Sequence, residues 1–186
     1  MFFHGTPYSP REAEWPGWSF YASINMSPTN SIWRDAPAFF DYIGRCQSFL
    51  QWGEPDNDLL VYLPYYDMIY EQPDRLALFD IHSMERRAPK FIHAIQSIIR
   101  SSYDVDYISD KYLAQTTMKD GNLTTTGQNK YAGIIVPDVR FMPLETLNHI
   151  LDLARQGAVV VFIKSLPQSV PGYNNEAKQE QFDRII

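Results

Sequence analysis

Short apolar runs alternate with amphipathic segments over most of the chain. Continuous apolar runs at residues 59–64, 105–108, 131–136 and 158–163 predict short β-strands, and the first has the composition of a strand buried on both faces. Apolar residues at helical spacing predict helices over about 84–102 and 143–156. This alternation of strand and helix predicts an α/β fold, with an open parallel sheet covered by helices on both faces.

Two further segments complete this region. The tetrapeptide Lys119-Asp120-Gly121-Asn122 is a turn signal, and short polar strands or loop are expected on either side of it. Residues 174–186 are polar with a weak helical tendency, and no strand pattern follows them. The sheet is therefore expected to be incomplete at its C-terminal end.

The first part of the chain has a different pattern. A short apolar stretch at residues 1–4 is typical of the end of a strand, and a loop rich in proline and glycine follows it. A helix is predicted over 33–51, with Ser31 as its N-cap and Gly53 just beyond its end. One strand, one loop and one helix cannot bury their own apolar faces, so this part is expected to pack on something else.

The tryptophans support the same division. The chain has 4 Trp, 12 Tyr and 11 Phe residues, and every tryptophan lies at or before Trp52. Turn-forming residues follow at 53–58, which predicts a boundary between domains at 1–53 and 54–186.

Composition excludes several classes of protein. So many aromatic residues exclude intrinsic disorder, and a single cysteine, Cys46, excludes a disulfide scaffold. No apolar run approaches the roughly 20 residues that cross a bilayer, so no membrane partner is expected. The formal net charge of −6 argues against nucleic acid as a partner.

The loop expected after the first strand is aromatic. In nucleotide-binding folds this loop cradles phosphate with glycine, but residues 64–70 contain none, so neither a nucleotide nor a flavin site is predicted. Two interpretations remain open. The loop packs against a neighbouring domain, or Tyr65 and Tyr66 stack on a sugar ring while Asp67 accepts hydrogen bonds from its hydroxyl groups.

Catalytic groups are hard to identify. Cys46 lies on the apolar face of a predicted helix, where a buried, inert thiol is expected rather than a nucleophile. Glycoside hydrolysis needs two carboxyl groups, but no pair stands out among the acidic residues of the first part, Glu12, Glu14, Asp35 and Asp41.

The histidines are widely spaced. No two of them have metal-ligand spacing, and His93 and His149 fall in predicted helices, where structural roles are expected. His4 differs because it directly follows a predicted strand, and barrel enzymes place their active sites at such strand ends. The remaining histidine is His82.

Several segments of the chain together form a recognisable pattern. They are 4–10 (His-Gly-Thr-Pro-Tyr-Ser-Pro), 15–23 (Trp-Pro-Gly-Trp-Ser-Phe-Tyr-Ala-Ser), 30–35, 42–50, 55–58, the Tyr66-Asp67 loop, 106–110 and 143–147. With these segments the chain resembles the bacterial α-L-rhamnosidases of glycoside hydrolase family 106. The resemblance covers essentially the whole chain and is most specific in its first fifty residues.

The resemblance implies a large, multidomain, inverting enzyme that removes terminal rhamnose from plant glycans and depends on calcium. It implies a (β/α)8 barrel followed by a flavodoxin-like or glutamine-amidotransferase-like α/β domain. Residues 1–53 then correspond to the last strand, loop and helix of the barrel, and residues 54–186 to most of the α/β domain. The family's catalytic glutamate pair falls before Met1, and no calcium ligand maps onto these positions. Family members are secreted, periplasmic or outer-surface proteins of bacteria, which leaves the localisation of this chain open.

We therefore expect a fragment or truncated relative of such an enzyme, inactive by itself, with neither a catalytic residue nor a cofactor of its own. Its expected partner is a rhamnose-containing glycan, bound through the full-length enzyme by His4, Tyr8, Trp15, Trp18, Tyr65, Tyr66 and Asp67. The alternative is a non-catalytic α/β module that binds carbohydrate or a partner chain, including a second copy of itself through the exposed barrel-edge surface.

Overall fold

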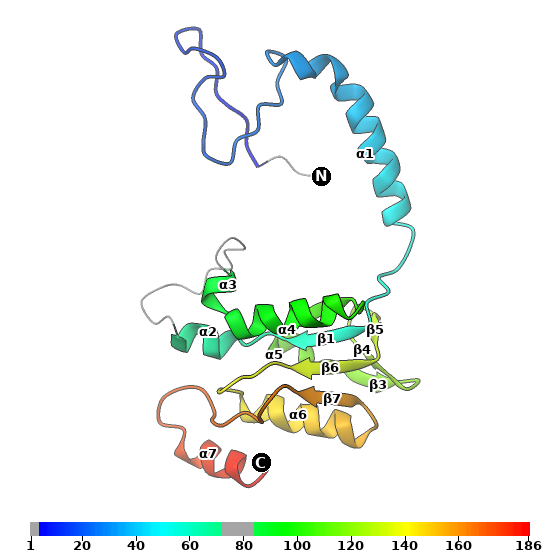
Figure 1. Cartoon of the computed structure of the whole chain (residues 1–186), viewed down its shortest axis with the longest axis vertical. Helices are drawn as coiled ribbons and strands as arrows, with labels where there is room; N and C mark the ends of the chain where they lie inside the picture. The colour runs from blue at the N-terminus through cyan, green and yellow to red at the C-terminus, as the bar shows by residue number, and fades with distance from the viewer. Residues whose placement is uncertain (1–3, 72–83) are drawn as a thin grey trace. The chain divides into compact units, whose positions relative to one another are not determined.

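The computed structural model of the chain describes residues 4–71 and 84–186. It divides into two compact units, Met1–Glu54 (unit 1) and Pro55–Ile186 (unit 2), which are coloured blue to cyan and cyan to red in Figure 1. Most of the strand end expected at residues 1–4, and also His82, lie outside the described residues.

Unit 2 is built on a four-stranded sheet. Its strands are β1 (Leu59–Tyr62), β2 (Val105–Ile108), β6 (Gly133–Val136) and β7 (Val159–Phe162). They lie in the order β2-β1-β6-β7, and every neighbouring pair is parallel. This confirms the predicted α/β fold with an open parallel sheet, and the order follows the start of the flavodoxin-like pattern 2-1-3-4-5.

Helices cover both faces of this sheet (Figure 1). Val61 and Ile135 pack in one core with α4 (Pro89–Arg100), α3 (Met84–Arg87) and Met68 of α2 (Tyr65–Glu71). Leu60, Tyr62 and Ile134 belong to the other core, with α6 (Leu144–Arg155) and α7 (Glu176–Asp183). Neighbouring residues of β1 thus enter opposite cores, as the two-residue period of a strand requires.

The helix expected over 84–102 is two helices. Ala88 has φ −138° and ψ 59°, outside the helical region, and it separates α3 from α4. The physical reason is Pro89, whose ring disfavours helical geometry at the preceding residue but suits the first position of a helix. The helix expected over 143–156 appears as α6.

A small antiparallel sheet lies beside the main one. Its strands are β3 (Thr117–Lys119), β4 (Asn122–Thr124) and β5 (Lys130–Tyr131), and a short helix, α5 (Asp110–Leu113), precedes them. Asp120 and Gly121 have φ of 51° and 79°. Positive φ at both central residues matches a type I′ hairpin turn, which confirms the turn predicted from the sequence.

One strand prediction needs correction. The strand expected over 131–136 belongs to two sheets, because the chain leaves the small sheet after Tyr131 and enters the main one at Gly133. Between them, the Ala132 amide donates a hydrogen bond to the Asp58 carbonyl at 2.8 Å. The strand expected at 158–163 is confirmed as β7. Because β7 lies at the sheet edge, Val159 and Val161 are exposed, while Val160 and Phe162 on its other face reach the core.

Unit 1 contains a looped segment followed by a helix. The 3-10 turn η1 (Ser31–Asp35) leads into α1 (Ala36–Leu50), which agrees with the helix expected over 33–51. The N-cap of η1, where the helical segment begins, is Asn30 instead of Ser31. The Asn30 side chain accepts a hydrogen bond from the Ile32 amide at 3.1 Å. Among the residues of α1, only Ala36 is buried. None of the described helices is long and apolar enough to span a bilayer.

The contact between β6 and β7 yields a stability prediction. A Cβ on Gly133 would lie 2.9 Å from the Val159 carbonyl oxygen and 3.1 Å from Val159 Cβ. Gly133→Ala should lower the free energy of unfolding by about 1–3 kcal/mol through overpacking. In Gly127→Ala the new Cβ has no atom closer than Thr125 Oγ1 at 4.0 Å, so this variant should unfold at the wild-type urea midpoint or slightly above. Far-UV circular dichroism would follow both transitions, and equal midpoints would contradict the β6–β7 contact.

A second prediction concerns alkaline pH. The Tyr131 hydroxyl donates to Asp106 Oδ2 at 2.7 Å, and burial together with this hydrogen bond raises the pKa of Tyr131 to about 12. Because the unfolded pKa is about 10, this contribution to stability is complete below that pH and is lost as the pH rises through the folded pKa. Wild type should therefore lose more free energy of unfolding than Tyr131→Phe between about pH 10 and about pH 12. Parallel pH profiles of urea unfolding would contradict the pKa assignment.

Candidate functional site

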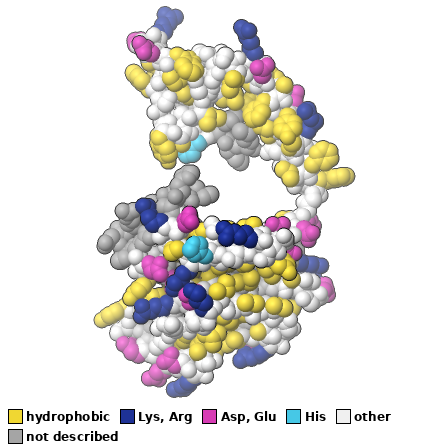
Figure 2. All heavy atoms as spheres, viewed as in Figure 1, with side chains coloured by type: hydrophobic (Ala, Val, Ile, Leu, Met, Phe, Trp, Pro, Cys, Tyr) yellow, Lys and Arg dark blue, Asp and Glu magenta, His cyan; other side chains and the backbone are white. Residues whose placement is uncertain are grey.

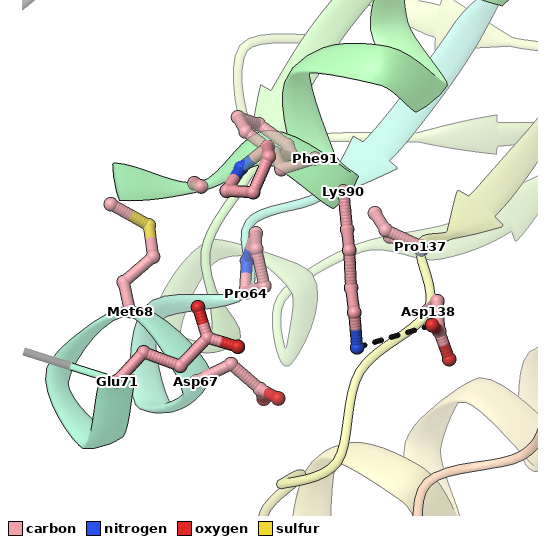
Figure 3. A pocket seen from close by; sticks show the side chains of 10 residues that line it. Pro64, Asp67, Met68, Glu71, Lys90, Phe91, Pro137 and Asp138 are labelled. Atoms are coloured by element: carbon pink, nitrogen blue, oxygen red, sulfur yellow. Dashed lines mark ion pairs between the residues drawn. The ribbon is translucent and has the colours of Figure 1, made fainter. Parts of the chain in front are cut away.

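The carboxyl edge of the main sheet is the natural place for a site. Strand order reverses between β1 and β6, because β2 lies on one side of β1 and β6 on the other. Open α/β sheets bind ligands outside the carboxyl ends of the strands at such a reversal. A crevice opens there (Figure 3), and its walls come from α2, the start of α4 and the segment after β6. Its lining residues are Pro64, Asp67, Met68, Glu71, Ala88, Pro89, Lys90, Phe91, Pro137 and Asp138.

An ion pair crosses this crevice. Lys90 Nζ lies 3.2 Å from Asp138 Oδ2, as the dashed line in Figure 3 shows, and Lys164 Nζ lies 3.6 Å from the same oxygen. Ser165 Oγ donates to Asp138 Oδ1 at 3.2 Å. Burial alone would raise the pKa of Asp138, but hydrogen bonding and positive charge from Lys90, with Ser165 and Lys164, hold it below its usual value. Asp138 is therefore an ionised link between α4 and the loops after β6 and β7.

The crevice is too small for a sugar. Its free volume of about 20 Å³ is enough for about one water molecule. The strand reversal therefore brings polar groups together, but larger openings lie beside the crevice. One, of about 400 Å³, is lined by α4, Asp138, Ile163 and Lys164, and a smaller, aromatic one lies at α2.

Asp67 does not point freely into solvent. Its Oδ1 accepts a hydrogen bond from the Arg140 amide at 2.7 Å, and its Oδ2 accepts one from the Phe141 amide at 3.1 Å. Both carboxylate oxygens thus hold backbone amides of a segment 73 and 74 residues further along the chain. The arrangement assigns Asp67 to positioning the loop after β6.

The expected aromatic loop is the short helix α2. Its Tyr65 and Tyr66 rings meet edge to face, with centroids 5.7 Å apart. Tyr66 lines an aromatic hollow of about 190 Å³, which is formed by Tyr66, Ile69, Tyr70, Phe141, Pro171 and Gly172. Burial is the largest cause of a raised pKa at Tyr66, followed by the charge of Asp110. The Tyr66 hydroxyl consequently stays protonated and can donate hydrogen bonds.

Sequence reasoning did not single out Tyr70 and Phe141, which line this hollow, or Arg140, which stacks on both rings. The Tyr70 and Phe141 ring centroids are 4.8 Å apart, and the Arg140 guanidinium lies 5.2 Å from the Tyr70 centroid and 5.1 Å from that of Phe141. A usable signal was present, because Arg140 and Phe141 closely follow the strand that was predicted to end at 136. Loops after neighbouring parallel strands meet at one edge of the sheet, so the loop after this strand is also expected to contribute residues to a site there.

The predicted residues of unit 1 lie in a hydrogen-bonded loop. Tyr8 and Trp18 form an isolated antiparallel bridge, with N–H to carbonyl distances of 3.0 and 2.8 Å, and their rings are in contact at 5.8 Å between centroids. His4 stacks on Phe20 instead, at 5.5 Å. Trp15 precedes the cis Trp15–Pro16 bond. The side chains of His4, Tyr8, Trp15 and Trp18 are all exposed.

Gly17 is required for the shape of this loop. Its φ is 97°, and a Cβ would lie 2.4 Å from the Tyr8 carbonyl oxygen and 2.9 Å from Ser9 Cα. Any other residue would push the two arms of the loop apart. The structure thus brings Tyr8 and Trp18 together in unit 1, and Tyr65, Tyr66 and Asp67 together in unit 2.

The remaining candidates have simple surroundings. His149 Nε2 lies 3.0 Å from the buried Thr116 carbonyl oxygen, which agrees with a structural role. Cys46 is half-buried, not buried as expected, because few other residues cover the face of α1 on which it lies. No group of three or more His, Cys, Asp or Glu side chains in the described part of the chain is arranged to hold a metal ion.

Comparison with known proteins places the chain in a family. The sequence model of the α-L-rhamnosidases, glycoside hydrolase family 106, matches residues 1–186. The chain is also similar to a putative beta-glucuronidase of Formosa agariphila, with 28% identity over 170 residues, which cover 91% of this chain and 13% of that protein. Because the family match extends over every residue, the chain belongs to glycoside hydrolase family 106, the α-L-rhamnosidase family.

Proposed function

We propose that this chain is part of a glycoside hydrolase that removes terminal α-L-rhamnose from plant glycans, and that it supplies glycan-binding surface while the catalytic carboxylates lie elsewhere in the enzyme. The observation that carries the proposal is the family match over residues 1–186. Similarity to a putative beta-glucuronidase supports the broader assignment to glycoside hydrolysis. The chain corresponds to only 13% of that relative, which leaves room for the catalytic groups outside it.

The environment of the carboxylates supports a non-catalytic role. A glycosidase needs one carboxyl group with a raised pKa as acid and a second as base or nucleophile. In unit 2, the half-buried carboxylates of Asp67, Asp106, Asp110 and Asp138 already accept hydrogen bonds from protein groups. In unit 1, the side chains of Glu12, Glu14, Asp35 and Asp41 are exposed.

The loop of unit 1 suits contact with sugar. Tyr8 and Trp18 are 67% and 66% exposed, yet their backbones are locked together by the bridge between them. Exposed aromatic faces on a rigid loop stack on the apolar face of a pyranose without a large loss of conformational entropy. We assign this loop, with His4 and Trp15, to the wall of the sugar pocket, and Tyr65 and Tyr66 to a further contact, with Asp67 positioning the loop after β6.

The exposed face of α1 supports the proposed origin of unit 1. Large apolar side chains along and just beyond this helix are exposed, and Figure 2 shows apolar groups over much of this part of the chain. A helix with so many exposed apolar residues needs a partner surface. In our proposal, residues 1–53 are the last strand, loop and helix of a (β/α)8 barrel, and the rest of the barrel covers this face. The exposed residues are Phe39, Phe40, Tyr42, Phe49, Leu50 and Trp52.

The same face favours a second candidate function. A non-catalytic α/β module would use it to bind a partner chain or a second copy of itself. Light scattering on the purified chain discriminates the two. A concentration-dependent dimer that becomes monomeric in a Phe49→Ser/Trp52→Ser variant would favour the module. A monomer at all concentrations would favour the barrel interpretation.

An activity assay tests the main proposal directly. The chain alone should not hydrolyse p-nitrophenyl α-L-rhamnoside, whereas a full-length family member assayed in parallel should. The physical reason is that, in our proposal, the carboxyl pair that the reaction needs lies outside this chain. Turnover by the 186-residue chain, at a rate that survives repeated purification, would contradict the proposal.

Substitutions test the sugar-contacting loop. In a full-length family member that carries the same residues, His4→Ala and Trp18→Ala should each lower kcat/KM for rhamnosides about tenfold, through lost stacking and hydrogen bonding. Tyr103→Ala, which removes an exposed ring before β2, is the control and should leave kcat/KM unchanged. Unchanged kcat/KM in both loop variants, with intact circular dichroism spectra, would show that this loop does not contact substrate.

A further inference from the structure

The aromatic hollow of unit 2 has the size and lining of a small binding site. Its volume of about 190 Å³ is below the roughly 300–1,000 Å³ of drug-sized sites, which fits one sugar ring better than a long ligand. Tyr70 and Phe141 form one aromatic wall, and Pro171 and Gly172 lie across from α2 in the loop after β7. Apolar ring faces of this kind stack on the C–H face of a pyranose.

A fixed positive charge borders this wall. The Arg140 guanidinium lies over both rings, and its Nη1 is 3.5 Å from the Tyr70 hydroxyl. In the described residues, no carboxylate lies within ion-pair distance of the Arg140 side chain, whereas Lys90, Lys164 and Lys178 each have one. Arg140 is exposed, so its planar set of donors is accessible to a ligand.

The hollow is held in place before any ligand binds. Asp67 accepts hydrogen bonds from the Arg140 and Phe141 amides, which fixes this segment to α2. The Arg140 carbonyl accepts from the Gln168 and Ser169 amides at 2.9 and 3.1 Å, and the Met142 amide donates to the Ser169 carbonyl at 3.0 Å. The loops after β6 and β7 are therefore joined to each other and to α2. A pre-organised site of this kind loses little conformational entropy on binding.

We propose that this hollow is a subsite for an acidic saccharide, a sugar ring that carries a carboxylate or sulfate group. The ring stacks on Tyr70 and Phe141, and the anionic group forms paired hydrogen bonds with the Arg140 guanidinium, whose fork matches a planar carboxylate or two sulfate oxygens. The Tyr66 hydroxyl, which remains protonated, adds a donor at the wall. The inference rests on the proposed glycan-processing function and adds the class of sugar that this part of the chain selects.

Titration of the purified chain tests the proposal. Methyl β-D-glucuronide, glucose 6-sulfate and the neutral methyl β-D-glucoside would each be added in low salt, with binding followed by calorimetry and by saturation-transfer NMR. At least one acidic sugar should bind about tenfold or more tightly than the neutral one, and this preference should weaken as NaCl is added. The two acidic ligands distinguish a carboxylate site from a sulfate site. Equal binding of all three sugars, or no binding of either acidic one, would overturn the proposal.

Variants locate the binding to the hollow. Arg140→Gln should weaken binding of the acidic sugar about tenfold to a hundredfold, and Arg140→Lys should recover only part of it, because an ammonium lacks the guanidinium fork. Tyr70→Ala should weaken binding of acidic sugars by removing the stacking face. Arg155→Gln on α6 removes another exposed guanidinium, away from the hollow, and is the control. Retention of full affinity in Arg140→Gln, with an unchanged circular dichroism spectrum, would refute the assignment.

These outcomes separate the inference from the proposed function. Binding of an acidic sugar by the chain, together with a full-length family member that fails to cleave rhamnosides, would leave the subsite standing and remove the rhamnosidase assignment. Rhamnoside turnover by the full-length protein, together with no acidic sugar bound to the chain, would remove the subsite alone.

Discussion

Burial of β1 on both faces is the constraint on which the architecture of unit 2 depends. Leu60, Val61 and Tyr62 are at most 1% exposed, and they enter two different cores in alternation. A strand of this kind must have helices on both sides and a paired strand along each edge. With β2 on one edge and β6 on the other, the sheet reverses its order at β1, and the loops after these strands come together at one edge.

Carboxylates then join these loops. Asp67 holds the backbone of Arg140 and Phe141, Asp138 attracts Lys90 and Lys164, and Asp110 accepts hydrogen bonds from Tyr62 and Thr146 at 2.9 and 2.6 Å. Each of these interactions connects residues far apart in the sequence. These acidic residues of unit 2 thus stabilise the carboxyl edge of the sheet, and Asp67 holds the segment that carries Arg140 and Phe141 beside the aromatic hollow.

Some aromatic residues of unit 2 are buried in its cores, whereas most of those in unit 1 are exposed. In unit 2, Tyr62 and Tyr131 are buried and donate hydrogen bonds to Asp110 and Asp106. In unit 1, the tryptophans and most other aromatic rings are exposed, even though the loop that carries Tyr8 and Trp18 is well defined by hydrogen bonds and by Gly17. Exposed rings on an ordered backbone are typical of surfaces that contact another molecule or another part of the same enzyme, which agrees with a role in glycan binding.

Apolar periodicity by itself determined the α/β class, the parallel strands and the helices α1 and α6, and turn-forming residues determined the hairpin turn at Asp120-Gly121. Each of these depends on residues close together in the sequence. The break in the helix before Pro89 also follows from a local rule, the effect of a proline on the residue that precedes it. Only the tertiary structure decided that Tyr131 and Gly133 belong to different sheets, that Asp67 holds the amides of Arg140 and Phe141, and that Arg140 borders an aromatic hollow. These features depend on which distant segments meet, and that is set by the order and edges of the sheet, about which the local pattern of apolar and polar residues carries no information.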